Sequence, residues 1–150
     1  MPVKELLGES QKAIVMPHYP HFLAEDNVVW TKFLRSGFTG LKKVWYDVRV
    51  GKAVSLPLGA TVLEQKIARG LTRKRIDAIC LVDGIYWVVE VKPYSNMTAL
   101  GQVLTYVRLF IRDYAFPGDA VPVIVCDAHD EDLEEEFIAQ GVMVIVNEPE

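Results

Sequence analysis

Residues 75–92 read RIDAICLVDGIYWVVEVK and indicate two β-strands joined by a tight turn. The runs on both sides of the turn are rich in Ile, Val, Tyr and Trp, residues that favour a pleated and buried surface. Asp83-Gly84 tolerates positive φ and is typical of a two-residue hairpin turn. We therefore predict strands over 74–82 and 85–92 and place this hairpin at the centre of the fold.

Three charged residues interrupt this apolar stretch, namely Asp77, Glu90 and Lys92. Glu90 and Lys92 are two residues apart and point to the same face of a strand, and Asp77 lies beside them if the neighbouring pleat is in phase. Carboxylates beside an apolar sheet lose hydration and repel each other, and a divalent cation relieves both costs. The alternative is a salt bridge of Lys92 at a sheet end, although the flanking residues are too apolar for a solvated strand.

Asp77 followed by Glu90-Val91-Lys92 across a hairpin resembles the PD-(D/E)xK nuclease superfamily, with Ile76 where the nominal motif has proline. The resemblance implies a metal-dependent DNA nuclease. In that reading Asp77 and Glu90 bind Mg²⁺ or Mn²⁺ together with the backbone carbonyl of Val91. Lys92 orients the attacking water or aids its deprotonation, and the metal lowers the pKa of that water.

Gln102 and Tyr106 stand four residues apart in GQVLTY, on the helix expected over 98–114. This Q-x-x-x-Y spacing is similar to that of the RecB-like branch of the superfamily, and the resemblance gives both residues a role in positioning the scissile phosphate or bracing Lys92. Judged singly, Tyr106 also reads as a packing aromatic residue and Gln102 as a solvent-facing one.

A helix is expected over 21–36, with Glu25 and Asp26 in its first turns. Acids at that place complement the helix dipole. By resemblance, the first helix supplies a further acid to the metal site; we carry that role onto Glu25 and keep Asp26 as the alternative. His18 and His21 lie among prolines, which disfavours a histidine metal pair there.

The net charge of −4 does not indicate a nucleic-acid-binding protein, but the charges are unevenly distributed. Residues 66–75 are basic without any acid, whereas 127–136 are strongly acidic. A local basic patch is what phosphate binding requires. The candidate DNA-backbone contacts are Lys66, Arg69, Arg73, Lys74 and Arg75. A solvated loop face is the alternative reading.

With 150 residues the chain is expected to form one domain, 1–150, with a poorly defined N-terminal extension over 1–20. No apolar run approaches the ~20 residues of a membrane span, so no membrane partner is expected. Cys80 and Cys126 fall in apolar runs and read as buried thiols, which favours a reducing, cytoplasmic setting. A homo-oligomer is left open.

The expected fold is α/β, with a mixed sheet flanked by helices on both faces. Its order is the restriction-endonuclease-like α-β-β-β-α-β core with a further α-β at the C-terminus. Strand–helix alternation in the second half predicts parallel pairing. The remaining expected elements are a short helix within 1–14, strands over 41–50, 53–58, 121–126 and 142–146, and helices over 61–69 and 130–140.

Two other function classes stay open. One is a nuclease-fold DNA-binding or assembly module without turnover, which the presence of Asp77, Glu90 and Lys92 disfavours. The other is an α/β protein that binds a small molecule or protein partner, for which the chain carries no G-x-G-x-x-G, G-K-[ST] or G-x-S-x-G motif. By analogy, stand-alone nuclease cores serve phages, mobile elements or DNA repair.

Overall fold

A five-stranded mixed sheet forms the centre of the protein in the computed structural model, which describes residues 3–149 and, at 69–71, the backbone only. In sheet order the strands are β2 (Leu41–Val50), β3 (Lys74–Val82), β4 (Ile85–Ser95), β6 (Ala120–His129) and β7 (Met143–Val146). Pairing is antiparallel from β2 to β4 and parallel from β4 to β7, as predicted. The α/β class and the mixed sheet are therefore confirmed.

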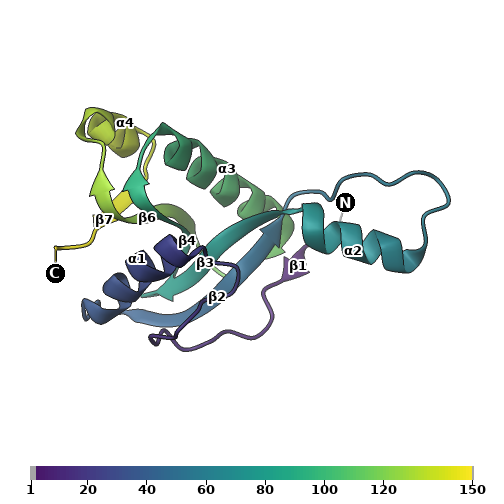
Figure 1. Ribbon diagram of the computed structural model, residues 1–150, viewed down its shortest axis with the longest axis horizontal. Helices are drawn as coiled ribbons and strands as arrows, with labels where there is room; N and C mark the ends of the chain where they lie inside the picture. The colour runs from purple at the N-terminus through teal and green to yellow at the C-terminus, as the bar shows by residue number, and fades with distance from the viewer. Residues whose placement is uncertain (1–2, 150) are drawn as a thin grey trace.

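Helices cover both faces of this sheet (Figure 1). On one face lies α1 (Ala24–Arg35), and on the other lie α3 (Met97–Asp113) and the short α4 (Glu134–Ala139), which follows the 3-10 turn η1 (Glu131–Leu133). Successive β4 residues alternate between these faces and both are apolar, because neither face is exposed to water.

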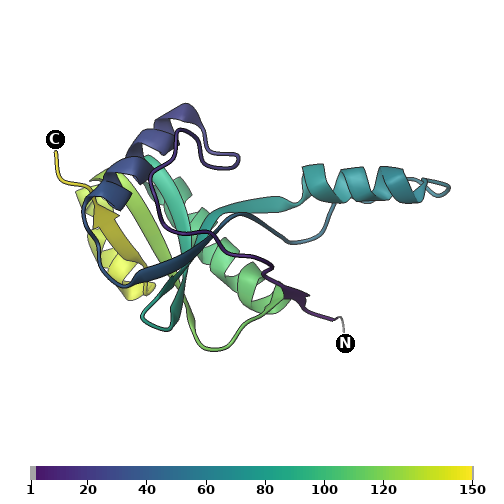
Figure 2. The same ribbon diagram turned by 90° about the horizontal axis from the view of Figure 1, so that it is seen from below.

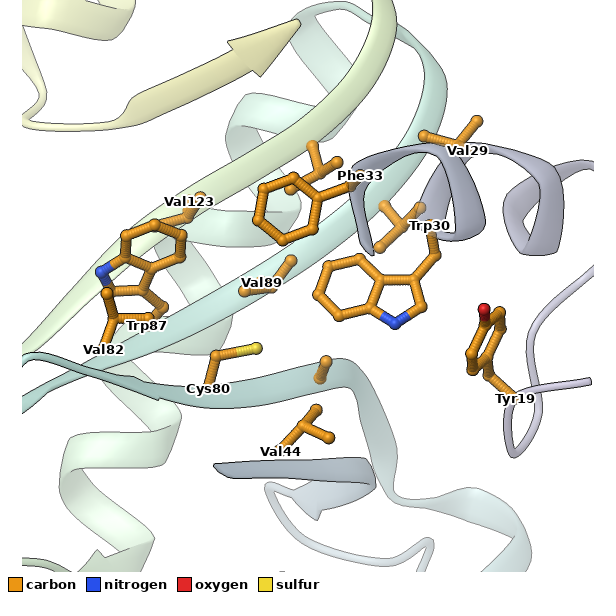
Figure 3. Close-up of a cluster of buried hydrophobic side chains, with 13 residues drawn as sticks. Tyr19, Val29, Trp30, Phe33, Val44, Cys80, Val82, Trp87, Val89 and Val123 are labelled. Atoms are coloured by element: carbon orange, nitrogen blue, oxygen red, sulfur yellow. The ribbon is translucent and has the colours of Figure 1, made fainter. Parts of the chain in front are cut away.

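The core under α1 is aromatic (Figure 3). Trp30 and Phe33 stack with ring centroids 5.1 Å apart and pack onto Cys80 and Val89 of the hairpin. The indole Nε1 of Trp30 donates a hydrogen bond of 2.8 Å to the hydroxyl of Tyr46, so its one polar atom has a partner. This packing holds α1 against β4 and β6, and the Trp30–Tyr46 bond ties it to β2.

The two hairpin strands separate partway along their length. Pairing between β3 and β4 ends at Ala78 and Val89. Beyond that point β3 remains paired with β2 as far as Lys74, whereas β4 remains paired with β6 as far as Ser95. We call the place where they diverge the fork.

Beyond the fork, β2 and β3 lead into a projection that stands clear of the body (Figures 1 and 2). We call its residues, 51–73, the arm. It contains α2 (Val62–Thr72), whose N-terminus is closed by a capping box between Thr61 and Glu64. The helix continues past Gly70, where it was predicted to stop. The edge strand predicted over 53–58 is wrong: these residues form a loop with no strand beside them.

The N-terminal segment is extended, so the short helix predicted there is wrong over the part that the structure describes. β1 (Glu5–Leu6) pairs in parallel with β5 (Tyr114–Ala115), and Gln11 bridges Val44 of β2. The backbone groups of this N-terminal segment thus hydrogen-bond to strands that are distant in the sequence, and local sequence patterns cannot indicate such partners.

Other boundaries differ by a few residues. β4 continues through Pro93 to Ser95, beyond its predicted end at residue 92, because only β6 borders it there. α1 starts later than predicted, since His21 has φ +62°. On the helices of the other face, Ile111 and Ile138 are exposed, whereas Phe110 is buried. Among the described residues, no helix combines the length and apolar character needed to cross a membrane.

Candidate active site

Asp77 is fixed at the fork by the backbone of the neighbouring strand. Its Oδ2 accepts a hydrogen bond of 2.8 Å from the N–H of Val91. The hairpin register would place Val91 opposite Ile76, two residue pairs beyond the last pair, Ala78 and Val89. The Asp77 carboxylate therefore accepts a hydrogen bond from a backbone N–H of β4 that no longer has a partner on β3, because the two strands have separated there. Val91 thus offers its N–H at this contact, and the metal-binding role of its carbonyl stays a prediction.

Glu90 lies beside Asp77 and is almost completely buried, with 5% of its surface exposed. The two carboxyl groups are close enough for each to shift the pKa of the other. The second oxygen, Oε2, is buried without a hydrogen-bond partner among the described residues. Burial is the main cause that raises the pKa of both acids, so the pair retains a proton that two ordinary carboxylates would lose.

Lys92 completes the predicted trio. Its Nζ lies 3.5 Å from Oε1 of Glu90, and 31% of its side chain remains exposed. The predicted arrangement of Asp77, Glu90 and Lys92 around one point is therefore present. A partly hydrated ammonium beside a buried acid is suited to contact a substrate group or a water from the solvent side.

The first helix directs Asp26, rather than Glu25, toward this trio. Asp26 is 8% exposed, whereas Glu25 is exposed. Burial raises the pKa of Asp26 and the charge of Lys92 opposes that rise, which places Asp26 near Lys92. Asp26 shares a helical face with Trp30 and Phe33, so the apolar stripe of α1 already contained the information needed to choose it.

From the other face, α3 supplies Tyr106 and Gln102. Burial, and then the charges of Glu90 and Asp77, raise the pKa of the Tyr106 hydroxyl, so it lies near the acids. Gln102 stands one helical turn earlier, and its buried Oε1 lacks a hydrogen-bond partner within the described chain. Both residues are half-buried on the side of the helix that faces the sheet.

The predicted basic residues separate into different environments. Lys66 and Lys74 are exposed. Arg73 is not: it binds the Glu5 carboxylate through two hydrogen bonds of 3.0 and 2.7 Å and the carbonyl of Gly51 at 2.8 Å. Arg73 thus ties the N-terminus to the base of the arm. The side chain of Arg69 lies outside the described residues.

Arg75 belongs to a network that the sequence did not indicate. Its Nη1 contacts Nδ1 of His21, and Nε2 of His21 lies 3.2 Å from Asp47. Asp47 also lies 3.5 Å from Nη2 of Arg49. Asp47 and His21 both have positive φ, of 53° and 62°. No local pattern could have revealed this cluster, because its members come from three separate segments.

The residues at the fork suit a hard cation in part. Asp77, Glu90 and nearby Asp26 offer only oxygen, and the buried Oε2 of Glu90 lacks a donor. Among the residues that the structure describes, no group of three or more His, Cys, Asp or Glu is arranged to hold a metal. Mg²⁺ commonly takes only one or two protein carboxylates and fills its remaining positions with water and substrate oxygens. The acidic pair fits that mode.

A hollow of about 400 Å³ lies elsewhere, between the N-terminal segment and β2, with Trp45, Asp47 and Arg49 in its wall. It does not include the acidic pair. Comparison of the chain with protein-family models, with curated proteins and with solved structures finds no match.

Proposed function

We propose that this protein is a metal-dependent DNA nuclease that hydrolyses phosphodiester bonds at the fork. The observation that carries the proposal is the adjacent pair of half-buried Asp77 and buried Glu90, with one unsatisfied oxygen on Glu90, next to Lys92. Burying two adjacent acids is costly unless a cation neutralises them. Groups with strongly raised pKa values that converge at one place are characteristic of functional sites.

Bound Mg²⁺ or Mn²⁺ would neutralise phosphate charge and lower the pKa of a water molecule there. Asp77 and Glu90 would hold the ion, and binding would displace the proton that the pair shares. Lys92 would direct the attacking water and stabilise negative charge that develops on the phosphate. Its partial exposure allows this contact while its stem stays packed beside Glu90.

Three further side chains have supporting roles in this proposal. Asp26 faces Lys92 from α1 and keeps the ammonium directed into the fork. Tyr106 carries a hydroxyl near the acids and would donate a hydrogen bond to a phosphate oxygen. Gln102, on the same helix, would use its amide to orient that phosphate.

DNA is the proposed substrate because the basic residues adjoin the site. β3 carries Lys74 and Arg75 immediately before Asp77, and exposed Lys66 lies on α2. A backbone that follows β3 would meet these cations before reaching the acids. Such contacts act on phosphates irrespective of sequence.

The test is a cleavage assay on single-stranded, duplex, flapped and four-way DNA with Mg²⁺, Mn²⁺ or EDTA. We expect cleavage of at least one substrate with a metal and none with EDTA. Absence of cleavage from all of them, by protein that is folded and binds DNA, would reject the nuclease.

The second candidate is a DNA-binding or assembly module without turnover. It is favoured by the contact between Lys92 and Glu90, which already supplies the acid with a counter-charge, and by the lack of a three-ligand group in the described part of the chain. In that case DNA binding would persist without cleavage and would be unchanged by Asp77→Asn.

A further inference from the structure

Two arginines occupy directly opposite positions on the strands that continue beyond the fork. Arg49 of β2 and Arg75 of β3 are paired residues of the antiparallel ladder. Both side chains are partly exposed, at 36% and 28%. Like charges at directly opposite positions of a sheet repel each other and destabilise the pairing. An arrangement of this kind therefore requires negative charge close to both guanidinium groups.

Asp47 supplies one negative charge to this pair. Its Oδ2 lies 3.5 Å from Nη2 of Arg49, and its Oδ1 lies 3.7 Å from Nε of Arg75. Only 10% of the Asp47 side chain is exposed, and Oδ1 lacks a hydrogen-bond partner among the described residues. Asp47 also has a φ of 53° within a strand. Strained residues of this kind persist where the surrounding structure imposes them, and they gather at functional sites.

His21 connects the carboxylate to the second arginine. Nδ1 of His21 is hydrogen-bonded to Nη1 of Arg75, and its Nε2 lies 3.2 Å from Oδ2 of Asp47. A guanidinium can only donate, so in this arrangement Nδ1 accepts and Nε2 carries the ring proton toward Asp47. Asp47 thus contacts Arg49 directly, and Arg75 both directly and through His21. We call these four residues the Asp47 network.

The charges of the Asp47 network do not balance. Two guanidinium groups, which are always charged, are paired with one carboxylate. A guanidinium presents its N–H donors in a rigid planar array that matches two oxygens of a phosphate. Arg49 also lines the hollow between the N-terminal segment and β2, so an anion can reach it from solvent. The network is therefore suited to bind a further anion, and phosphate is the anion whose geometry it matches.

The Asp47 network adjoins the acids at the fork. Arg75 precedes Asp77 by two residues on β3, a separation of about 6–7 Å along a strand. That separation is comparable with the spacing of neighbouring phosphates in a nucleic-acid strand. The segment that leads into α1 contributes His21 to the network, and the first turn of the same helix contributes Asp26 to the fork. One DNA strand can therefore place one phosphate at the acids and the next at the arginines.

We propose that Arg49 and Arg75 together bind one backbone phosphate of DNA, next to the phosphate at the fork, and that Asp47 and His21 are positioning residues that hold the two guanidinium groups in place. The inference rests on the proposed function only in taking DNA as the ligand. It adds an oriented anchor to the contacts that exposed lysines make.

Asp47→Asn tests the positioning role through the sign of its effect. The change keeps the shape of the side chain and a residue type that tolerates positive φ, and it removes one negative charge. Electrostatics alone would then tighten DNA binding, whereas loss of orientation should weaken it by about tenfold, the effect of losing one charge-assisted hydrogen bond. Binding of a fluorescein-labelled duplex in EDTA measures the affinity. Glu9→Gln, an exposed acid that lines the same hollow, is the matched control and should bind no more weakly than the wild type.

The salt dependence of the same binding tests whether the arginines share a phosphate. Arg49→Ala with Arg75→Ala should lower the slope of log affinity against log salt by about 0.9, the value for one phosphate, whereas two separate contacts would give about 1.8. Arg35→Ala, at the far end of α1 and exposed, is the control and should leave the slope unchanged.

Each outcome decides a stated point. Unchanged or tighter binding by Asp47→Asn would overturn the positioning role, and a slope change of zero or about 1.8 in the double arginine variant would overturn the shared site. If Asp47→Asn does not fold, His21→Asn replaces it, since asparagine also tolerates the φ of 62° there; it should weaken binding, and unchanged binding would count against the proposal. Negative results in a protein that cleaves DNA would remove this site and keep the nuclease. Binding through the network without any cleavage would keep the site and remove the nuclease, and a wild type that binds no DNA would remove both.

Discussion

The carboxyl groups of Asp77 and Glu90 lie close together at the fork, although they come from strands that no longer pair there. Two carboxylates removed from water side by side repel each other, and burial favours the protonated form of both. If the proposed function is correct, a cation would take the place of the proton that burial favours here, and its binding would release that proton.

The first prediction concerns pH and stability in EDTA. Folding raises the pKa of both acids above their ordinary values of 3.8 and 4.5. Their contribution is therefore fully present below those values and is lost as pH rises toward the raised pKa values. Glu90→Gln should match the wild-type melting temperature near pH 4 and exceed it at pH 8 by about 4 °C.

Thermal melts of both proteins from pH 4 to 9 in EDTA measure this effect. Saturating Mn²⁺ should reverse the order at pH 8, because Mn²⁺ stabilises only the protein that binds it. A constant difference between the two proteins across the pH range would show that Glu90 is not the titrating group.

The second prediction separates the two acids of α1. Asp26→Asn should weaken Mn²⁺ binding and cleavage by about tenfold, as loss of a supporting group beside a metal typically does. Glu25→Gln is the matched control, one position away and exposed, and should stay within about twofold of the wild type by the same reasoning. Calorimetry measures Mn²⁺ binding and an assay measures the cleavage rate for both variants. Equal losses in the two variants would mean that the negative charge at the start of α1, and not the position of Asp26, affects metal binding.

The third prediction separates DNA contacts from structural cations. Lys66→Ala with Lys74→Ala should lower the slope of log affinity against log salt by about 2, or roughly 0.9 for each lost phosphate contact. Arg73→Ala should lower the melting temperature instead, because it releases Glu5 and the Gly51 carbonyl. Salt titrations of DNA binding, with melts alongside, test both; an unchanged slope in the lysine variant would exclude those lysines from the DNA contact.

The fourth prediction concerns the metal ligands. Asp77→Ala and Glu90→Ala should each weaken Mn²⁺ binding strongly in calorimetry, because either change leaves a single carboxylate for the ion. Asp83→Ala, an acid in the hairpin turn at the opposite end of β3, is the control and should bind normally. If Mn²⁺ binding is unchanged in both site variants, Asp77 and Glu90 do not bind the metal.

The hairpin was predictable because its information is local. Asp83-Gly84 indicates the turn, and both residues have positive φ, 47° and 82°, in the structure. That turn sets the pairing register of β3 with β4, and this register places Asp77 beside Glu90 and close to Lys92. The parallel half was predictable for a similar reason, since apolar strands alternate with amphipathic helices.

The arm and the network around Asp47 were not predictable in this way. The sequence over 53–58 looks like a strand, but no strand lies beside it, and the N–H of Val54 donates to the hydroxyl of Thr72 on α2 instead. His21 and Asp47 meet through tertiary contact, with backbone conformations that their sequences do not favour. The choice between Glu25 and Asp26 was within reach, because the phase of Trp30 and Phe33 selects Asp26.

The most direct test of the central claim is the cleavage rate of Lys92→Ala, measured on a preparation whose fold and Mn²⁺ binding match the wild type. Nζ of Lys92 lies 3.5 Å from Glu90, on the proposed metal ligand's own strand. Loss of a group that positions a proton transfer lowers the rate by about 10²–10⁴. The account predicts that loss for Lys92→Ala and none for Lys43→Ala, an exposed lysine of β2. A less stable Lys92→Ala protein that cleaves as fast per folded molecule as the wild type would contradict it.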